Sequence, residues 1–171
     1  MIRPARSEDA EAIARIQRQS VEAMDSTMAA SATTEEIMQQ LAALGEREVW
    51  LAVEEAEGVV GWGVVKQYSP RPGYRLCCET SIFLDRGLRG RGLGRPLQQE
   101  LLDRSVALGY HHVVAKIWAE NSGSIRFHER FGYEMVGVQR EIGRVGGQWR
   151  DVAIMQKILG KHLSGNGLRA Q

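Results

Sequence analysis

The sequence predicts one α+β domain built on a mixed β-sheet, and three observations support this prediction. The 171 residues match the length of about one domain. Short apolar runs with period two alternate with stretches of helical period, so strands and helices interleave along the chain. The Glu57-Gly58 pair between two such runs is typical of a hairpin, which argues against a purely parallel, doubly wound sheet.

The helices are predicted from their caps and from the spacing of apolar residues. Ser7 precedes two acidic residues and is expected to cap the first helix. Thr33 and Glu36 form a capping-box signature for the second helix. The third helix carries a stripe of leucines that we expect to be buried. The four helices are predicted after Ser7, from Thr33 to about Gly45, after Leu93 and over 122–130.

The remaining apolar runs predict seven strands. They lie around Ile2 and over 48–54, 59–68, 75–84, 111–118, 134–142 and 149–158. From residue 160 onward glycines and polar residues replace this pattern. We therefore expect a single domain over 1–160 and a flexible tail over 161–171.

Composition excludes several classes of protein. The 22 basic and 21 acidic residues leave a net charge of +1, which argues against a dedicated nucleic-acid binder. No apolar run approaches the length of a membrane helix, and the N-terminus lacks the apolar core of a signal peptide. Cys77 and Cys78 are neighbours that point to opposite faces of a strand, so they are poor partners for a disulfide. We expect a soluble cytoplasmic protein with no membrane partner and no nucleic-acid partner, whose chemistry runs without a bound metal or with His and carboxylate ligands only.

The most informative segment is the glycine- and arginine-rich stretch 88–96 between a strand and a helix. Its glycines let the backbone approach a ligand, and the helix start offers N–H groups to an anion. Arg89, Arg91 and Arg95 add positive charge, so the segment predicts a phosphate site; the alternative is an exposed turn with glycines for geometry alone. The Rossmann pattern fails because Arg95 holds its last glycine position, and the P-loop pattern fails because Leu93 replaces its lysine.

The pattern that fits is R-x-x-G-x-G, and it resembles the acetyl-CoA-binding motif of the GNAT N-acetyltransferases. A second similar block, an Asn-x-x-Ser sequence before a short helix and a Gly-Tyr pair, lies at 121–133. The resemblance implies that backbone amides of the turn hold the CoA pyrophosphate and that the pantetheine arm pairs with the preceding strand. For Asn121 the alternative is a helix cap, and both roles are compatible. The implied cofactor-binding residues are Ile82, Phe83, Leu84, Arg89, Gly90, Arg91, Gly92, Leu93, Gly94, Asn121 and Ser124.

Further blocks narrow the resemblance to the phosphinothricin and methionine sulfoximine N-acetyltransferases. They lie at 69–74, 79–83, 121–129 and 147–156, so the likeness runs over nearly the whole chain, from about residue 2 to residue 159. It implies a GNAT-like domain with about seven strands flanked by about four helices, acetyl-CoA as co-substrate, no metal, and a homodimer.

Glu79 and His128 are the candidate catalytic residues. In the resembling family a Glu at the position of Glu79 is the proposed general base, and an amine that is protonated at neutral pH needs such a carboxylate before it can attack a thioester. The alternative is that Glu79 is a solvent-facing strand residue. His128 occupies the position of a Tyr that protonates the CoA thiolate in many GNAT members. Its spacing from Ile125 and Phe131 turns it inward, so it is also a candidate for a satisfied core residue or for an orienting group.

The acceptor side is less determined. Arg71, Tyr74, Arg75 and Lys116 are candidate substrate-binding residues, because a basic clamp can fix the carboxylate of an acceptor. The resemblance implies that the region of Trp149 and Asp151 helps build the substrate pocket and the dimer contact, but for Trp149 we favour packing in the core. The chain departs from the resembling family at 24–31, which lacks aromatic residues, at 144–146, which reads Arg-Val-Gly, and at Lys116, where a Gly is common. These departures fall where an acceptor pocket is expected, so the acceptor stays open.

The function predicted from the sequence is transfer of an acetyl group from acetyl-CoA to the primary amine of a small amino-acid-like acceptor, of the phosphinothricin or methionine sulfoximine type. We expect direct attack in a ternary complex. One alternative is a GNAT acetyltransferase for another amine, such as a protein N-terminus or a polyamine. A second is a non-catalytic acyl-CoA-binding module, which the presence of Glu79 disfavours.

Overall fold

A computed structural model of the chain describes residues 1–24 and 30–160. In this part seven strands form one mixed sheet in the order β1-β2-β3-β4-β5-β7-β6, which confirms the predicted fold class. Neighbouring strands are antiparallel except for β4 and β5. The strands are β1 (Ile2–Pro4), β2 (Val49–Glu55), β3 (Gly58–Gln67), β4 (Cys77–Leu84), β5 (His112–Trp118), β6 (Glu134–Val145) and β7 (Gln148–Ile158).

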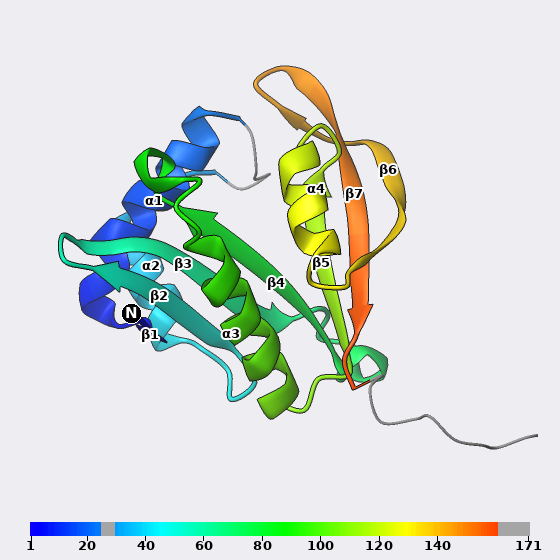
Figure 1. Cartoon of the computed structure of the whole chain (residues 1–171), viewed down its shortest axis with the longest axis horizontal. Helices are drawn as coiled ribbons and strands as arrows, with labels where there is room; N and C mark the ends of the chain where they lie inside the picture. The colour runs from blue at the N-terminus through cyan, green and yellow to red at the C-terminus, as the bar shows by residue number, and fades with distance from the viewer. Residues whose placement is uncertain (25–29, 161–171) are drawn as a thin grey trace, which may run out of the picture.

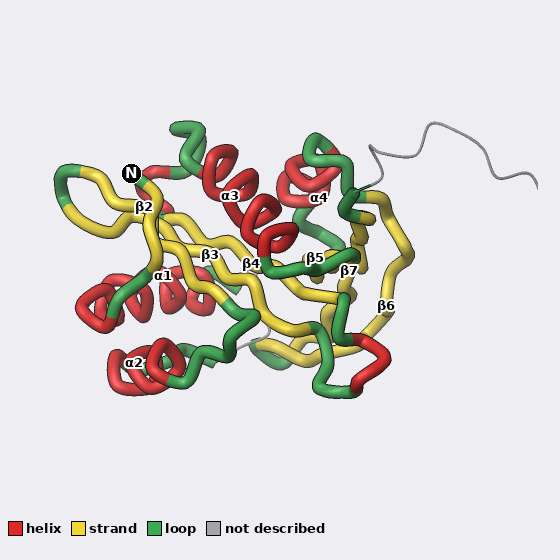
Figure 2. Tube along the Cα trace, turned by 90° about the horizontal axis from the view of Figure 1, so that it is seen from below, coloured by secondary structure: helices red, strands yellow, loops and turns green. Residues whose placement is uncertain are grey.

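The helices cover both faces of the sheet. Helices α1 (Ala10–Glu22) and α2 (Thr34–Ala42) lie on one face, and α3 (Gly94–Ala107) and α4 (Ser122–Glu129) lie on the other (Figures 1 and 2). The middle strands are therefore apolar on both sides, and alternate residues enter two separate cores. No helix in the described ranges is long and apolar enough to cross a bilayer.

The N-terminal helix begins later than predicted. Residues Ser7–Asp9 form a short 3₁₀ turn, and the side chain of Asp9, rather than that of Ser7, accepts the backbone N–H of Arg6 at 2.7 Å. A carboxylate three residues after Arg6 can reach back to this N–H, whereas the side chain of the adjacent Ser7 accepts no capping hydrogen bond. The prediction that Ser7 caps the helix is therefore wrong, whereas the capping box of Thr33 and Glu36 is confirmed.

A buried ion cluster joins β1 to the start of α1. The guanidinium of Arg3 donates two hydrogen bonds to Asp9, at 2.7 and 2.8 Å, and a third to Glu54 of β2 at 2.8 Å. Asp9 is buried, so its charge depends on these partners. The hydrogen bonds from Arg3 hold the pKa of Asp9 below its ordinary value of 3.8, against the opposing effect of burial.

Strands β4 and β5 pair over only three residues and then part. The parallel register runs from Cys77–His112 to Glu79–Val114. Beyond it, β4 keeps its pairing with β3 as far as Leu84, and β5 keeps its pairing with β7 as far as Trp118. The last five residues of β4 therefore pair on one side only. This opening in the middle of the sheet positions the site.

Two expectations about single residues have different outcomes. Cys77 and Cys78 are both free thiols, and burial raises the pKa of Cys78 to about 11. Trp149 is 57% exposed, so the expectation that it packs in the core is wrong. It pairs with Arg144 in the β6–β7 hairpin, whose end projects past α4 (Figure 1).

Candidate active site

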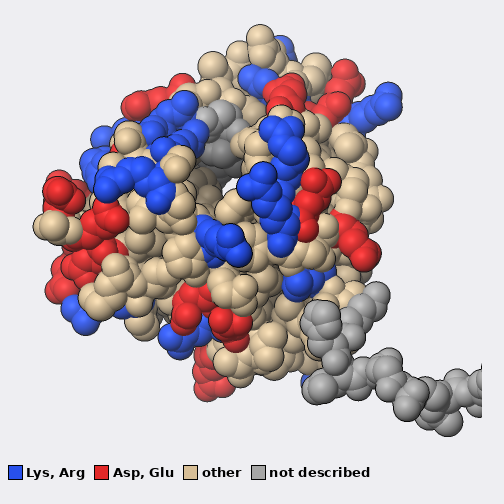
Figure 3. Space-filling view, viewed as in Figure 1, with Lys and Arg blue, Asp and Glu red and all other residues tan. Residues whose placement is uncertain are grey.

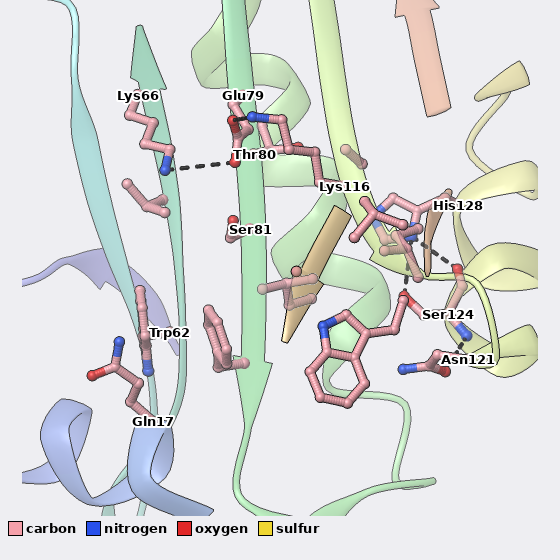
Figure 4. Close-up of a pocket in the computed structure, with 18 of the residues that line it drawn as sticks. Gln17, Trp62, Lys66, Glu79, Thr80, Ser81, Lys116, Asn121, Ser124 and His128 are labelled. Atoms are coloured by element: carbon pink, nitrogen blue, oxygen red, sulfur yellow. Dashed lines mark hydrogen bonds and ion pairs between the residues drawn. The ribbon is translucent and has the colours of Figure 1, made fainter. Parts of the chain in front are cut away.

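A cavity of about 880 Å³ passes through the opening between β4 and β5. Its walls include residues from both faces of the sheet, because the side chains of a strand alternate between the faces. Figure 4 shows Glu79 between Lys66 of β3 on one side and Lys116 of β5 on the other, with Asn121, Ser124 and His128 of the α4 segment beyond Lys116. The predicted site residues that the cavity brings together are Glu79, Ile82, Phe83, Lys116, Asn121, Ser124 and His128.

Glu79 lies at the point where the pairing of β4 with β5 ends. The residue is only 9% exposed, so the solvent-facing alternative is wrong. Two ammonium groups flank the carboxylate: Nζ of Lys116 lies 2.8 Å from Oε2, and Nζ of Lys66 lies 3.5 Å from Oε1. A carboxylate in this position can take a proton from an amine that enters the cavity.

His128 is buried on the α4 side of the cavity. Its Nδ1 lies 2.8 Å from the carbonyl oxygen of Ser124, and a carbonyl only accepts, so Nδ1 carries the hydrogen and Nε2 is the acceptor of the neutral ring. Burial lowers the pKa of His128 below its ordinary value of 6.5, although the bond to Ser124 opposes this. His128 is thus mainly neutral at neutral pH, and proton donation from Nε2 would need the imidazolium that burial disfavours.

The burial of His128 predicts a pH dependence of stability. Because the pKa of His128 is lower in the folded than in the unfolded chain, the unfolded chain binds more protons below about pH 6.5. The free energy of unfolding therefore decreases as the pH is lowered through this range. We expect His128→Gln to lose this contribution, so its free energy of unfolding should fall less between pH 7 and pH 5 than that of the wild type. Urea unfolding at several pH values measures both slopes.

The matched control for this prediction is His112→Gln. The pKa of His112 is also lowered by burial, but His112 lies on β5 outside the cavity lining. We expect this variant to flatten the pH dependence as well while leaving the cavity intact. Equal slopes for the wild type and His128→Gln would contradict the assignment of a neutral buried imidazole.

Asn121 combines the two roles considered for it. Its Oδ1 accepts the backbone N–H of Ser124 at 3.0 Å, so it caps α4, and both residues also line the cavity.

A buried hydrogen-bond network lies behind the site. It joins Thr80 of β4 to Tyr133, with 3.1 Å between their hydroxyl oxygens, and Tyr133 to Gln98 of α3 at 3.0 Å. The network fixes β4 and the end of the α4 segment relative to each other beside Glu79.

The glycine-rich turn lies beyond the far end of β4. Gly90 and Gly92 have φ values of +82° and +83°, a backbone conformation that favours glycine. Helix α3 then begins at Gly94 without a side-chain cap, and Gly94 packs against Ile82 and Leu84. Residues 89–94 and Leu84 lie outside the cavity lining. Figure 3 shows Lys and Arg side chains gathered on both sides of a hollow in this face, over the α3 start and over α4.

The structure separates the predicted acceptor residues. Lys116 lines the cavity, whereas Arg71, Tyr74 and Arg75 are exposed in the loop before β4 and lie outside its lining. Of the two segments that depart from the resembling family, residues 25–29 lie outside the described part of the chain. The other segment contributes Arg144 and Val145 to the cavity wall. Within the described residues no group of three or more His, Cys, Asp or Glu side chains is placed to hold a metal ion.

Sequence reasoning missed an aromatic stack beside the site. Trp50, Trp62 and Phe83 come from three adjacent strands, and their rings stack with centroids 4.8 and 4.5 Å apart. All three line the cavity, together with Lys66 and Gln17. The alternation of each strand would give the face of these residues, but only the cross-strand register brings them together.

Comparison with known proteins places this site in a family. Residues 2–154 match the model of the acetyltransferase (GNAT) domain, so the chain belongs to the GNAT acetyltransferases. An L-methionine sulfoximine/L-methionine sulfone acetyltransferase of Pseudomonas paraeruginosa is 35% identical over 108 residues, which span 63% of this chain and 63% of that protein. A phosphinothricin N-acetyltransferase of Streptomyces viridochromogenes is 33% identical over 91% of this chain and 86% of that protein.

A solved structure shows the same architecture. The GNAT superfamily phosphinothricin acetyltransferase of Sinorhizobium meliloti, in complex with acetyl-CoA, superposes with a TM-score of 0.88 at 29% identity, covering 94% of this chain and 88% of that chain. The fold and the family are therefore shown.

Proposed function

We propose that this protein is an acetyl-CoA-dependent N-acetyltransferase that acts on the primary amine of a small amino-acid-like acceptor, by direct attack in a ternary complex. The observation that carries the proposal is the place of Glu79, a buried carboxylate in a cavity that passes through the sheet where β4 and β5 part. The relatives named as acetyltransferases of phosphinothricin, methionine sulfoximine and methionine sulfone support the class of acceptor.

We propose that acetyl-CoA lies along the open side of β4 and reaches the turn before α3. The unpaired side of β4 at Ile82, Phe83 and Leu84 suits the amide-bearing pantetheine arm as an added strand, with Asn121 and Ser124 across the opening. The uncapped start of α3 and the turn 89–94 suit the pyrophosphate, since both offer backbone N–H groups to an anion. When bound, acetyl-CoA supplies the activated acetyl thioester.

In the proposed reaction Glu79 takes a proton from the acceptor amine, and the neutral amine attacks the thioester carbonyl. Backbone N–H groups near Ile82 stabilise the negative charge that develops on the carbonyl oxygen. His128 orients the sulfur or the acceptor through its neutral ring, which the bond to Ser124 fixes in one tautomer. Burial disfavours the charged form of His128 and therefore disfavours direct proton donation from it.

The two positive charges beside Glu79 influence which acceptors can bind in the cavity. Lys66 and Lys116 both lie within 4 Å of the carboxylate, so the pocket attracts an acceptor that carries an anionic group and repels a polyamine. Lys116 is the proposed clamp for a carboxylate of the acceptor. Arg71, Tyr74 and Arg75, which lie outside the cavity lining, stay proposals for contacts with the acceptor.

The test is release of CoA thiol from acetyl-CoA with a panel of acceptors, alongside calorimetric binding of acetyl-CoA. The panel contains phosphinothricin, methionine sulfoximine, methionine sulfone, common amino acids, spermidine and a short peptide. We expect turnover with the amino-acid analogues and none with spermidine. Binding of acetyl-CoA without turnover of any acceptor would contradict the proposed activity, and failure to bind it would also overturn the proposed cofactor path.

A glycine substitution tests the proposed pyrophosphate site. We expect Gly92→Ala to destabilise the chain by about 1 kcal/mol, because φ is +83° there, and to weaken acetyl-CoA binding as well. The matched control is Gly58→Ala, which imposes comparable strain at φ +109° in the β2–β3 turn and should leave the Kd unchanged. Equal Kd values for all three proteins would contradict a pyrophosphate site at this turn.

The proposed homodimer has support in the edge strand of the sheet. The β6–β7 hairpin exposes apolar side chains, among them Val136, Val138, Ile142 and Trp149, each at least 48% exposed. Contiguous apolar surface on an edge strand is typical of an interaction site. Sedimentation equilibrium of the wild type and of Val136→Lys tests this, with a shift from dimer to monomer expected for the variant.

A further inference from the structure

The ammonium group of Lys116 occupies the position beside Glu79 in which the proposed reaction needs an acceptor amine. Its ammonium donates a hydrogen bond to Oε2 of Glu79 at 2.8 Å, the contact through which the proposed base takes a proton. Its side chain is 43% exposed and lines the cavity, so the amine is not sealed in a core. Figure 4 shows the chain of Lys116 reaching from β5 to Glu79 across the opening.

The second lysine beside Glu79 is placed differently. Lys66 lies on β3, on the side of β4 that stays paired, and its Nζ is 3.5 Å from Oε1 without a hydrogen bond between them. Lys116 instead comes from β5, directly before Ile117, which lines the opening where the thioester is proposed to lie. Only Lys116 therefore combines contact with the base and attachment to the strand that borders the opening.

We propose that Lys116 is a self-acetylation site, modified by the chain's own activity when no small acceptor occupies the pocket. The inference rests on the proposed function. Glu79 accepts one proton from the ammonium, and the neutral Nζ forms a C–N bond with the acetyl carbonyl while the C–S bond breaks. The second proton of the amine passes to the departing thiolate, which leaves as CoA thiol, and Glu79 returns its proton to solvent. The product is a neutral amide on Lys116.

The modification would change the pocket that it lies in. Acetylation removes one of the two positive charges beside Glu79 and replaces an ammonium donor by a bulkier amide. The proposed clamp for an acceptor carboxylate would then be lost. A free acceptor protects Lys116, because its amine competes for the same contact with Glu79.

The experiment incubates the purified full chain with acetyl-CoA that carries a ¹³C-labelled acetyl group, without acceptor. Peptides from a digest that does not cut at lysine are then analysed by mass spectrometry. We expect label at Lys116, at a rate independent of protein concentration, and slower labelling when a turned-over acceptor is added. Lys66 and Lys157 in the same sample report the background of purely chemical acetylation.

Two variants separate this reaction from that background. We expect Glu79→Gln to slow labelling of Lys116 about 10²-fold or more, since a general base typically contributes 10²–10⁴-fold. Lys116→Arg keeps the positive charge beside Glu79 and should remove the label from this peptide without moving it to Lys66. Labelling of Lys116 no faster than that of Lys66 and Lys157, or labelling unaffected by Glu79→Gln, would overturn the proposal.

Failure of this inference is distinguishable from failure of the proposed function. Thiol release with the acceptor panel and calorimetric binding of acetyl-CoA are measured on the same preparation. Turnover of a free acceptor with an unlabelled Lys116 overturns self-acetylation alone. Absence of both acetyl-CoA binding and turnover overturns self-acetylation together with the function on which it rests.

Discussion

Replacing Glu79 with glutamine is expected to lower kcat/KM for acetyl transfer about 10²–10⁴-fold, the usual contribution of a general base. The amide keeps the shape of the side chain and its contact with Lys116, but it cannot take the proton of the acceptor amine. Steady-state thiol release with the best acceptor of the panel measures the effect. The proposed cofactor path lies along Ile82–Leu84 and the turn 89–94 and does not include the carboxylate of Glu79. The Kd for acetyl-CoA should therefore change by no more than about twofold, which is a small fraction of the 1.4 kcal/mol that a tenfold change in Kd represents.

The control for this prediction is Glu57→Gln, which removes a carboxylate from the exposed β2–β3 turn. This variant should retain wild-type kcat/KM. If Glu79→Gln also kept wild-type activity, another base would have to be found among the groups that line the cavity.

Removing the charge of Arg3 is expected to have the largest effect on stability. Arg3→Met leaves Asp9 buried without its guanidinium partner, and breaking such a pair typically costs about 3–5 kcal/mol. Urea unfolding at pH 7 measures the loss. The double variant Arg3→Met/Asp9→Leu should recover much of it, because an apolar pair of similar volume leaves no buried charge.

The same variant has a defined pH dependence. The lowered pKa of Asp9 in the folded chain means that its contribution is present above the unfolded value of 3.8 and is lost as pH falls through the folded value. The difference in stability between wild type and Arg3→Met should therefore shrink as the pH falls through the folded-state pKa of Asp9, which lies below 3.8. A difference that stays constant from pH 7 to pH 3 would contradict the assignment of the loss to this ion cluster.

The order and type of the elements were predictable because each carries its own signal. Period two, helical period and the capping box of Thr33 and Glu36 are local features, and all seven strands and four helices follow from them. Element ends were less predictable, because they depend on tertiary contacts. Strand β6 continues to Val145, past the predicted end at residue 142, since pairing with β7 resumes after an irregular stretch between Gln139 and Gly143.

The site residues also divide into those that the sequence indicates and those that only the strand register brings together. Glu79 and His128 were expected from the family resemblance, and the structure places both in one cavity. Lys66 was missed because the loop between β3 and β4 is too long for a tight turn to set the register, and only the register pairs Lys66 with Glu79. The aromatic stack of Trp50, Trp62 and Phe83 was missed for the same reason. Trp149 was misjudged because composition does not reveal where the covering layers end.

The parting of β4 and β5 also bears on how the molecule opens. One half-sheet, β1 to β4, meets the other, β5 to β7, through three residue pairs, so the junction between the halves has few backbone hydrogen bonds to break. Such a junction is expected to separate in sub-global fluctuations before either half unfolds, and the amides on the open side of β4 should exchange hydrogen early. A ligand that spans both halves would suppress this opening, by about 2.7 kcal/mol at 100 times its Kd. The acyl donor would thus act as a missing strand that makes the two halves one cooperative unit.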